Sequence, residues 1–205
     1  FEFSLAYETI KAVNQENAEI INQQVDLSYS AIPPLQFSTF LTNHDQDRLM
    51  DQLGCSKERN MVAASLLLTA PGVPFLYYGE EIGMQGIGHE GARQPMQWSG
   101  DTSAGFTTGT PWHPVGPGWE TFNVADQTND SASLLSHYRN LIRARNQHAA
   151  LRVGDVSVVS TGDPALYSIL RVSQEEAVLV LINLTSNPIL NPTLNLENSY
   201  LHEGS

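Results

Sequence analysis

Two short apolar runs, each followed at once by polar residues, constrain the fold of this chain most strongly. Residues 37–41 and 73–78 are rich in β-favouring side chains, and an Ala- and Leu-rich segment, residues 56–69, separates them. The separating segment is a helix candidate with Ser56 as its N-cap. A strand, a helix and a second strand in this order predict a right-handed βαβ unit with parallel strands.

The segments on both sides extend this pattern. Residues 1–6 are an apolar run that we predict to be a strand, and residues 7–24 are predicted to be a helix, with any extension ended by Pro33-Pro34. Residues 83–128 are rich in Gly, Pro and Trp and lack periodicity, which is typical of a functional loop region.

A further helix and three strands follow the loop region. Asp130 is a candidate cap for a helix whose apolar face consists of Leu134, Leu135, Tyr138, Leu141 and Ile142. Short strands are predicted at 156–160, 165–172 and 177–183, with a turn at Gly162-Asp163-Pro164. The change of pattern after Leu151 predicts a small antiparallel β domain.

Charge and cysteine content limit the partners and chemistry. The net charge of −12 argues against binding to nucleic acid or to an anionic membrane. The apolar stretch 61–78 contains Pro71, Gly72 and Pro74, so we expect no membrane helix. Cys55 is the single cysteine, and no nearby His or Asn indicates a thiol dyad, which favours a small residue near a helix start.

Two polar clusters follow the predicted strands. In parallel α/β folds, ligands bind beyond the carboxyl ends of the strands. There His44 and Asp45 could hold sugar hydroxyls or place a carboxylate beside a developing positive charge, as glycoside hydrolysis requires. A turn cap and a satisfied histidine explain the same residues equally well. For the adjacent Glu80 and Glu81, caps or ion pairs after a strand are the favoured interpretation.

The loop region holds aromatic and metal-ligand candidates. Aromatic faces suit both sugar stacking and ordinary loop anchoring, and both remain open for Trp98, Trp112, Trp119, Phe106 and His113. The potential ligands His89, Glu90, Asp101 and His113 lack the spacing of a zinc site. A calcium site built from loop oxygens is compatible with the sequence, but no pattern points to one.

Four segments in order resemble one known family. Residues 40–48 (FLTNHDQDR) and 71–84 (PGVPFLYYGEEIGM) resemble the seventh- and eighth-strand segments of the α-amylase superfamily. Residues 93–98 (RQPMQW) and 104–112 (AGFTTGTPW) are similar to its following loop in oligo-1,6-glucosidases, α-glucosidases and related bacterial α-amylases. A lone Asn-His-Asp is a weak signal, whereas four such segments in order are specific.

The resemblance implies an α/β fold: the C-terminal part of a (β/α)8 TIM barrel, followed by a small antiparallel β-sandwich domain that is incomplete. It makes 1–6, 37–41 and 73–78 the sixth, seventh and eighth strands. We expect residues 1–151 to belong to the barrel and residues 152–205 to the C-terminal β domain.

The resemblance also implies a retaining hydrolysis of α-glucosidic bonds in starch-like or malto- and isomalto-oligosaccharides. Asp45 matches the aspartate that stabilises the transition state, and Asn43, His44 and Arg93 match substrate-binding positions. The usual partner carboxylate of Arg93 is expected outside this chain. No motif matches the nucleophile or the acid/base, so we expect the chain alone to be inactive. No cofactor is implied, although calcium in the parent is compatible.

Other interpretations stay open. The chain could belong to a transglycosylating relative such as a trehalose synthase, or serve as a non-catalytic sugar-binding or interaction module. The expected partners are an α-glucan or α-glucoside and the N-terminal part of the barrel. A partial barrel has unpaired strand edges, so we expect the isolated chain to self-associate. No leader is visible at Phe1, and the localisation stays undetermined.

Overall fold

The computed structural model describes residues 1–33 and 35–196. Pro34, and residues 197–205 of the predicted β domain, lie outside the described residues. The chain divides into two units. The first holds Phe1–Phe40, Val62–Phe75 and the described residues from Leu141 on, and the second holds Leu41–Met61 and Leu76–Asn140. None of the described helices combines the length and the apolar character needed to cross a membrane.

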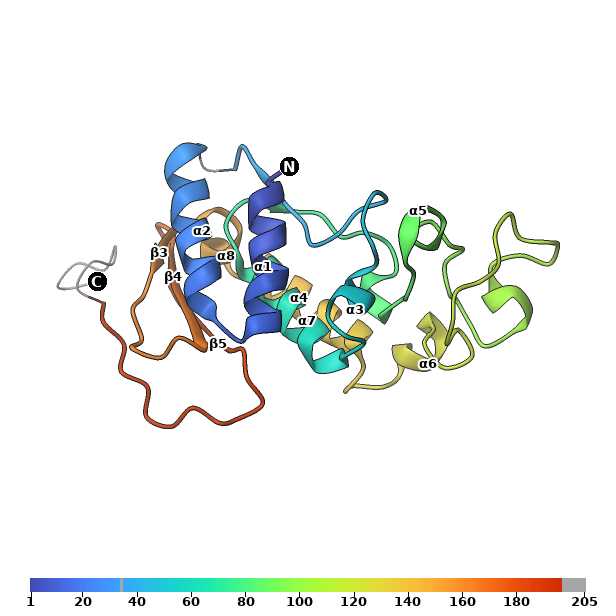
Figure 1. The fold of residues 1–205 in the computed structure, drawn as a ribbon. Coiled ribbons are helices and arrows are strands. Elements are labelled where there is room, and N and C mark those ends of the chain that lie inside the picture. Colours follow the sequence, from blue (N-terminus) through green and yellow to red (C-terminus); the bar gives the residue numbers. More distant parts are fainter. Residues whose placement is uncertain (34, 197–205) are drawn as a thin grey trace. The chain divides into compact units, whose positions relative to one another are not determined.

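The first unit begins with two helices that lie side by side, α1 (Phe3–Gln15) and α2 (Ala18–Ala31) (Figure 1). The predicted strand at residues 1–6 is wrong, because the side chain of Glu2 caps α1 by accepting a hydrogen bond from the Leu5 N–H. The single helix predicted at 7–24 is also wrong. Glu16 adopts a left-handed conformation and Asn17 caps α2, which resets the helical phase and explains the loose apolar periodicity.

Two parallel strands form the βαβ unit that the sequence predicts. β1 (Ser38–Thr39) pairs with β2 (Val73–Pro74), and α4 (Lys57–Thr69) connects them. The N–H of Glu2 also donates to the carbonyl of Ser38 (2.8 Å), so only this residue adds to the β1 edge where a sixth strand was expected. Both strands are shorter than the predicted runs, and the apolar side chains of Val73 and Phe75 are exposed.

The C-terminal part of the first unit is a three-stranded antiparallel sheet. It consists of β3 (Asp155–Val158), β4 (Leu166–Val172) and β5 (Ala177–Asn183), with the buried β4 in the centre. The predicted positions of these strands are confirmed to within one or two residues. The short helix α8 (Ala149–Val153) precedes the sheet. The described part of the predicted β domain provides one sheet, whereas a sandwich requires two.

The second unit is mainly irregular, as expected for the Gly- and Pro-rich loop region. It contains short helical segments: α3 (Leu49–Gln52), η1 (Glu80–Ile82), α5 (Gly88–Gly91), η2 (Thr102–Gly105) and α6 (Val124–Thr128). One apolar cluster in its core consists of Ile82, Met84, Met96 and Leu135, with Val124 packed against it.

Helices α4 and α7 (Leu134–Gln147) contribute residues to both units. Ser56 caps α4, as predicted, because its hydroxyl accepts the N–H of Arg59. The cap of α7 is Ser133, whose hydroxyl accepts the N–H of Ser136, and not Asp130 as predicted. Asp130 lies one turn earlier and accepts the N–H of Ala132.

Candidate active site

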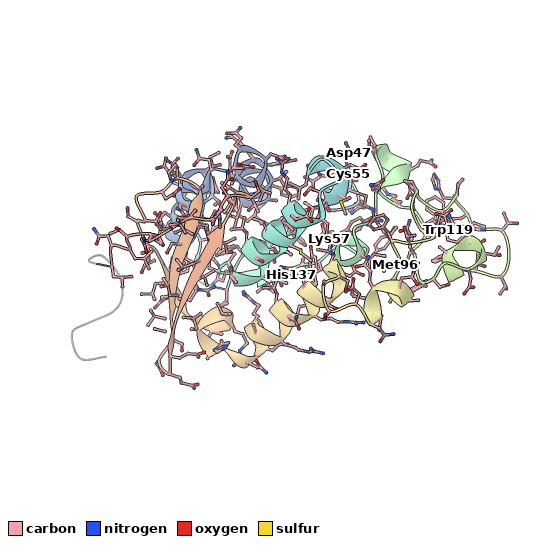
Figure 2. All side chains as sticks on the ribbon, turned by 90° about the horizontal axis from the view of Figure 1, so that it is seen from below. Asp47, Cys55, Lys57, Met96, Trp119 and His137 are labelled. Atoms are coloured by element: carbon pink, nitrogen blue, oxygen red, sulfur yellow. The ribbon has the colours of Figure 1, made fainter. Side chains whose placement is uncertain are left out.

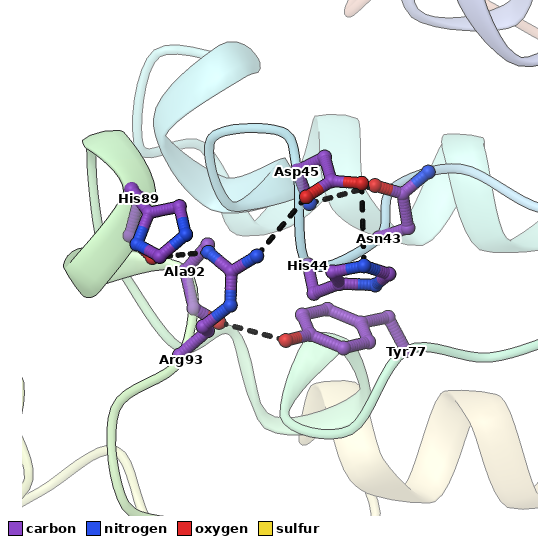
Figure 3. Close-up of polar contacts among 7 residues, drawn as sticks. All are labelled: Asn43, His44, Asp45, Tyr77, His89, Ala92 and Arg93. Atoms are coloured by element: carbon purple, nitrogen blue, oxygen red, sulfur yellow. Dashed lines mark hydrogen bonds and ion pairs between the residues drawn. The ribbon is translucent and has the colours of Figure 1, made fainter.

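Asp45 lies at the centre of a polar cluster in the second unit (Figure 3). Its Oδ1 atom lies 3.0 Å from Nη2 of Arg93, and its Oδ2 atom lies 3.2 Å from Nε2 of His44. The side chain keeps 68% of its surface exposed. An exposed ion pair of this kind contributes little to folding stability, but it orients a carboxylate whose surface stays open to a ligand.

The turn that carries Asp45 is fixed locally. The Oδ1 atom of Asn43 accepts the backbone N–H of Asp45 at 2.8 Å, which is an Asx turn that begins four residues after the end of β1. The structure therefore places three predicted site residues, Asn43, His44 and Asp45, on one short turn.

Arg93 reaches Asp45 from a loop far along the chain. Its Nη1 atom donates to the carbonyl of His89 at 2.6 Å, while Nη2 pairs with Asp45. Within the described residues, the carboxylate that Arg93 contacts is thus Asp45. The partner carboxylate that the resemblance implies outside this chain stays a prediction.

Two tyrosines hold the backbone on both sides of Arg93. The Tyr77 hydroxyl donates to the carbonyl of Ala92 (3.0 Å), and the Tyr78 hydroxyl donates to the carbonyl of Gln94 (2.7 Å). The two rings also lie 4.8 Å apart, edge to face. These contacts fix the loop that presents the guanidinium, and they were not anticipated from the sequence.

Arg48 contacts both tyrosines. It is buried, its guanidinium lies over the Tyr77 and Tyr78 rings at 4.7 and 4.4 Å, and Nη1 donates to the carbonyl of Tyr78. Such cation–π contacts are strongest when desolvated. In the sequence, the role of Arg48 is indicated only by its presence in the same motif as Asp45.

Glu80 joins the segment after β1 to the segment after β2. Its Oε1 atom accepts hydrogen bonds from the N–H and the hydroxyl of Thr42, and the side chain is buried. Burial raises the pKa of Glu80 to about 7, although the bonds from Thr42 oppose the shift. Glu81 instead accepts the N–H of Gly79. Both glutamates thus make hydrogen bonds within the protein; the bond of Glu81 is a local cap, whereas Glu80 makes a hydrogen bond to Thr42 instead of the cap or ion pair that was favoured.

The remaining candidates make contacts of other kinds. Cys55 is exposed beside the start of α4 (Figure 2). His113 Nε2 lies 3.5 Å from Glu90 Oε2, and Trp112 packs against the His113 ring. Across residues 1–33 and 35–196, no group of three or more His, Cys, Asp or Glu side chains is arranged to hold a metal ion.

Comparison with known proteins connects this geometry to a family. A model of the α-amylase catalytic domain matches residues 2–154. Oligo-1,6-glucosidase of Parageobacillus thermoglucosidasius is 30% identical over 190 residues, which cover 72% of this chain and 34% of that protein. The chain therefore spans about a third of the length of the curated relatives that it matches.

Solved structures agree with this match. The crystal structure of an α-amylase from H.orenii has a TM-score of 0.83 and 34% identity, covering 91% of this chain and 39% of that one. A mutant isomaltulose synthase from Erwinia rhapontici NX5, solved with D-glucose, has a TM-score of 0.71 and 25% identity, covering 82% and 38%. The chain thus belongs to the α-amylase catalytic-domain family and carries part of its TIM-barrel fold.

Proposed function

We propose that this chain is part of a retaining glycoside hydrolase that cleaves α-glucosidic bonds in starch-like or malto- and isomalto-oligosaccharides. The observation that supports this most directly is the carboxylate of Asp45, exposed and held between His44 and Arg93 in the segment that follows β1. An oxocarbenium-like transition state needs such a carboxylate at its flank.

Each site residue has a distinct proposed role. Asp45 stabilises the positive charge that develops on the sugar ring and accepts hydrogen bonds from its hydroxyls. Arg93 and His44 orient Asp45 and contact the same sugar. Asn43 contributes its side-chain NH₂ group, since its Oδ1 atom already accepts the Asp45 N–H. The chemistry requires carboxyl groups and no cofactor.

This assignment also implies which parts of the complete protein supply which catalytic groups. We infer that residues 1–151 belong to the catalytic barrel and that residues 152–205 belong to a C-terminal β domain. The nucleophile and the acid/base are supplied by the rest of the barrel. The 205-residue chain by itself is therefore inactive, because a retaining mechanism needs both groups.

An assay of two proteins tests the proposal. The longest natural reading frame that contains this chain, and the chain itself, are each assayed on maltose, isomaltose and soluble starch. We expect turnover with retained anomeric configuration from the former and none from the latter. Asp45→Asn should lower kcat by about 10²- to 10³-fold, the range for losing one preorganised electrostatic group.

The exposed Asp101→Asn is the matched control and should retain full turnover. Its carboxylate bonds the hydroxyl of Ser99 and does not contact Arg93. Turnover by the 205-residue chain that Asp45→Asn abolishes would contradict the proposed division, because carboxylates within the chain would then supply the missing roles.

A transglycosylating or isomerising enzyme is the second candidate. It is supported by the likeness to the isomaltulose synthase structure. The same assay separates the two, because a hydrolase releases monosaccharide whereas a transglycosylase yields a new disaccharide linkage. Sugar binding without either product from the complete reading frame would favour a non-catalytic module.

A further inference from the structure

Glu80 connects the two segments that carry the partners of the Asp45–Arg93 ion pair. Its Oε1 atom accepts the N–H of Thr42 at 3.0 Å and also accepts a hydrogen bond from the Thr42 hydroxyl. Thr42 directly precedes the turn of residues 43–45, which ends at Asp45. A displacement of Thr42 would therefore move the Asp45 carboxylate.

The backbone before Glu80 leads to Arg93. Tyr77 and Tyr78 lie shortly before Glu80 in the chain, and their hydroxyls donate to the carbonyls of the residues on either side of Arg93. Figure 3 shows the bond from Tyr77 together with the ion pair between Arg93 and Asp45. The segments that hold the two charged groups are thus joined to each other at Glu80.

The backbone that carries Glu80 is itself closely held. Gly79 has a φ of 85°, in the left-handed region, and a Cβ atom there would overlap the Met84 side chain. The Glu81 carboxylate accepts the N–H of Gly79 at 2.8 Å. The carbonyl of Glu80 accepts the N–H of Gly83 at 3.1 Å. Glu80 therefore presents its acceptor oxygen at a fixed place before any substrate binds.

Water cannot replace the bonds between Glu80 and Thr42. Each of the two residues keeps 2% of its surface accessible. Removing the Glu80 acceptor leaves the N–H and the hydroxyl of Thr42 without this partner in the interior, and an unpaired buried donor is costly enough to shift the segment. Because Glu80 is buried, it does not contact the substrate.

We propose that Glu80 is a positioning residue for the reaction: through Thr42 it fixes the Asp45 carboxylate at the place where that group stabilises the transition state. This proposal rests on the proposed function. A displacement of about 1 Å in a catalytic site can lower the rate by about 100-fold. Loss of the Glu80–Thr42 bonds therefore lowers kcat more than it raises KM, because the contact of Asp45 strengthens in the transition state.

Variants of the complete reading frame separate loss of the acceptor from loss of the carboxyl group. Glu80→Gln keeps an acceptor oxygen, so we expect its kcat to stay within about 2-fold of wild type. Glu80→Met has a similar length and no such oxygen, and it should lower kcat by about 10- to 100-fold while KM changes by less than about 3-fold. Thr42→Val loses the hydroxyl but keeps the N–H and should give an intermediate kcat, whereas Thr42→Ser should retain wild-type kcat.

A control variant tests whether lower stability alone reduces kcat. Arg145→Met removes buried hydrogen bonds to carbonyls of the first unit and changes no residue of the Asp45 cluster. All variants are assayed at a temperature at which circular dichroism shows them folded, and we expect Arg145→Met to retain wild-type kcat. The proposal is overturned if Glu80→Gln loses as much kcat as Glu80→Met, or if Glu80→Met loses no more than Arg145→Met.

Crystal structures of the wild-type and Glu80→Met proteins separate failure of this proposal from failure of the proposed function. We expect the distance between Asp45 Oδ1 and Arg93 Nη2, 3.0 Å here, to grow by about 1 Å in the variant. If the distance grows but the wild-type protein hydrolyses no glucoside, the proposed function is wrong and Glu80 still positions Asp45. If Asp45→Asn lowers kcat while Glu80→Met changes neither kcat nor the distance, the proposed function stands and Glu80 has no positioning role.

Discussion

Glu80 makes the stability of the chain depend on pH in an unusual direction. Its pKa is raised from 4.5 to about 7 in the folded state. Between these values the folded state binds more protons than the unfolded state, so the stability from Glu80 is complete below about pH 4.5 and is lost as the pH rises to about 7. The total loss is on the order of 3 kcal/mol.

Glu80→Gln should remove this pH dependence, because the amide stays neutral and its oxygen can still accept the bonds from Thr42. Urea unfolding at several pH values between 4 and 8 measures the effect. We expect the free energy of unfolding of the variant to rise relative to wild type as the pH increases. The exposed Glu120→Gln is the control, and parallel curves for Glu80→Gln and wild type would refute the prediction.

The residues of the site were predictable to different degrees. Motif resemblance located Asp45, His44 and Arg93 individually, because each lies in a short string with a characteristic order. It did not predict the contact between Asp45 and Arg93, 48 residues apart, which depends on the tertiary path of the loop. Arg48 and Tyr77 each donate to a backbone carbonyl, and Arg48 also lies over the Tyr77 ring. Contacts of this kind require no particular spacing in the sequence, so they could not be predicted from it.

At the scale of elements, the end of α4 depends on buried arginines. Arg145 donates to the carbonyls of Leu68, Ala70 and Gly72, and Arg171 donates to the carbonyl of Thr69. The last carbonyls of a helix have no intrahelical partner, so these guanidinium groups satisfy those of Leu68 and Thr69 and two further carbonyls just beyond α4. Burial lowers the pKa of Arg145 to about 10, with Arg171 adding repulsion.

Arg145→Met should lower the free energy of unfolding by about 2–4 kcal/mol, because three buried carbonyls lose a charged donor while the apolar stem is retained. Thermal or urea unfolding measures this loss. Arg143→Met tests whether the loss of any arginine from α7 has this effect, since Arg143 is exposed on the same helix. A similar cost for both variants would show that the capping contacts are unimportant.

Elements were predicted well where local signals are strong and poorly where the signal is a short apolar run. Ser56 and the Ala- and Leu-rich segment correctly indicated α4. The run at residues 1–6 is compatible with both a strand and a helix, and the Glu2 cap decides for the helix. The run at 73–78 was predicted as a strand because it is apolar and rich in β-favouring residues, whereas only Val73 and Pro74 form β2, which pairs with β1 alone among the described strands.

At the scale of the whole molecule, the first unit exposes a cluster of apolar side chains. Phe1, Phe3, Val73 and Phe75 keep 71%, 48%, 42% and 48% of their surface accessible. Phe1 contacts the Phe40 and Phe75 rings edge to face, so these groups form a continuous aromatic surface beside the two-stranded sheet. A short parallel sheet with an uncovered face is marginally stable alone.

We therefore predict that the isolated chain self-associates through this surface and the free edge of β2. Sedimentation velocity at increasing concentration should show a shift to dimers or larger species. Replacing Val73 and Phe75 by lysine should restore a monomer, because charge at a strand edge opposes pairing. Leu190→Lys is the matched control, since Leu190 is 79% exposed and lies outside the aromatic surface. A wild-type chain that stays monomeric at all concentrations would mean that this surface is stable in water without a partner.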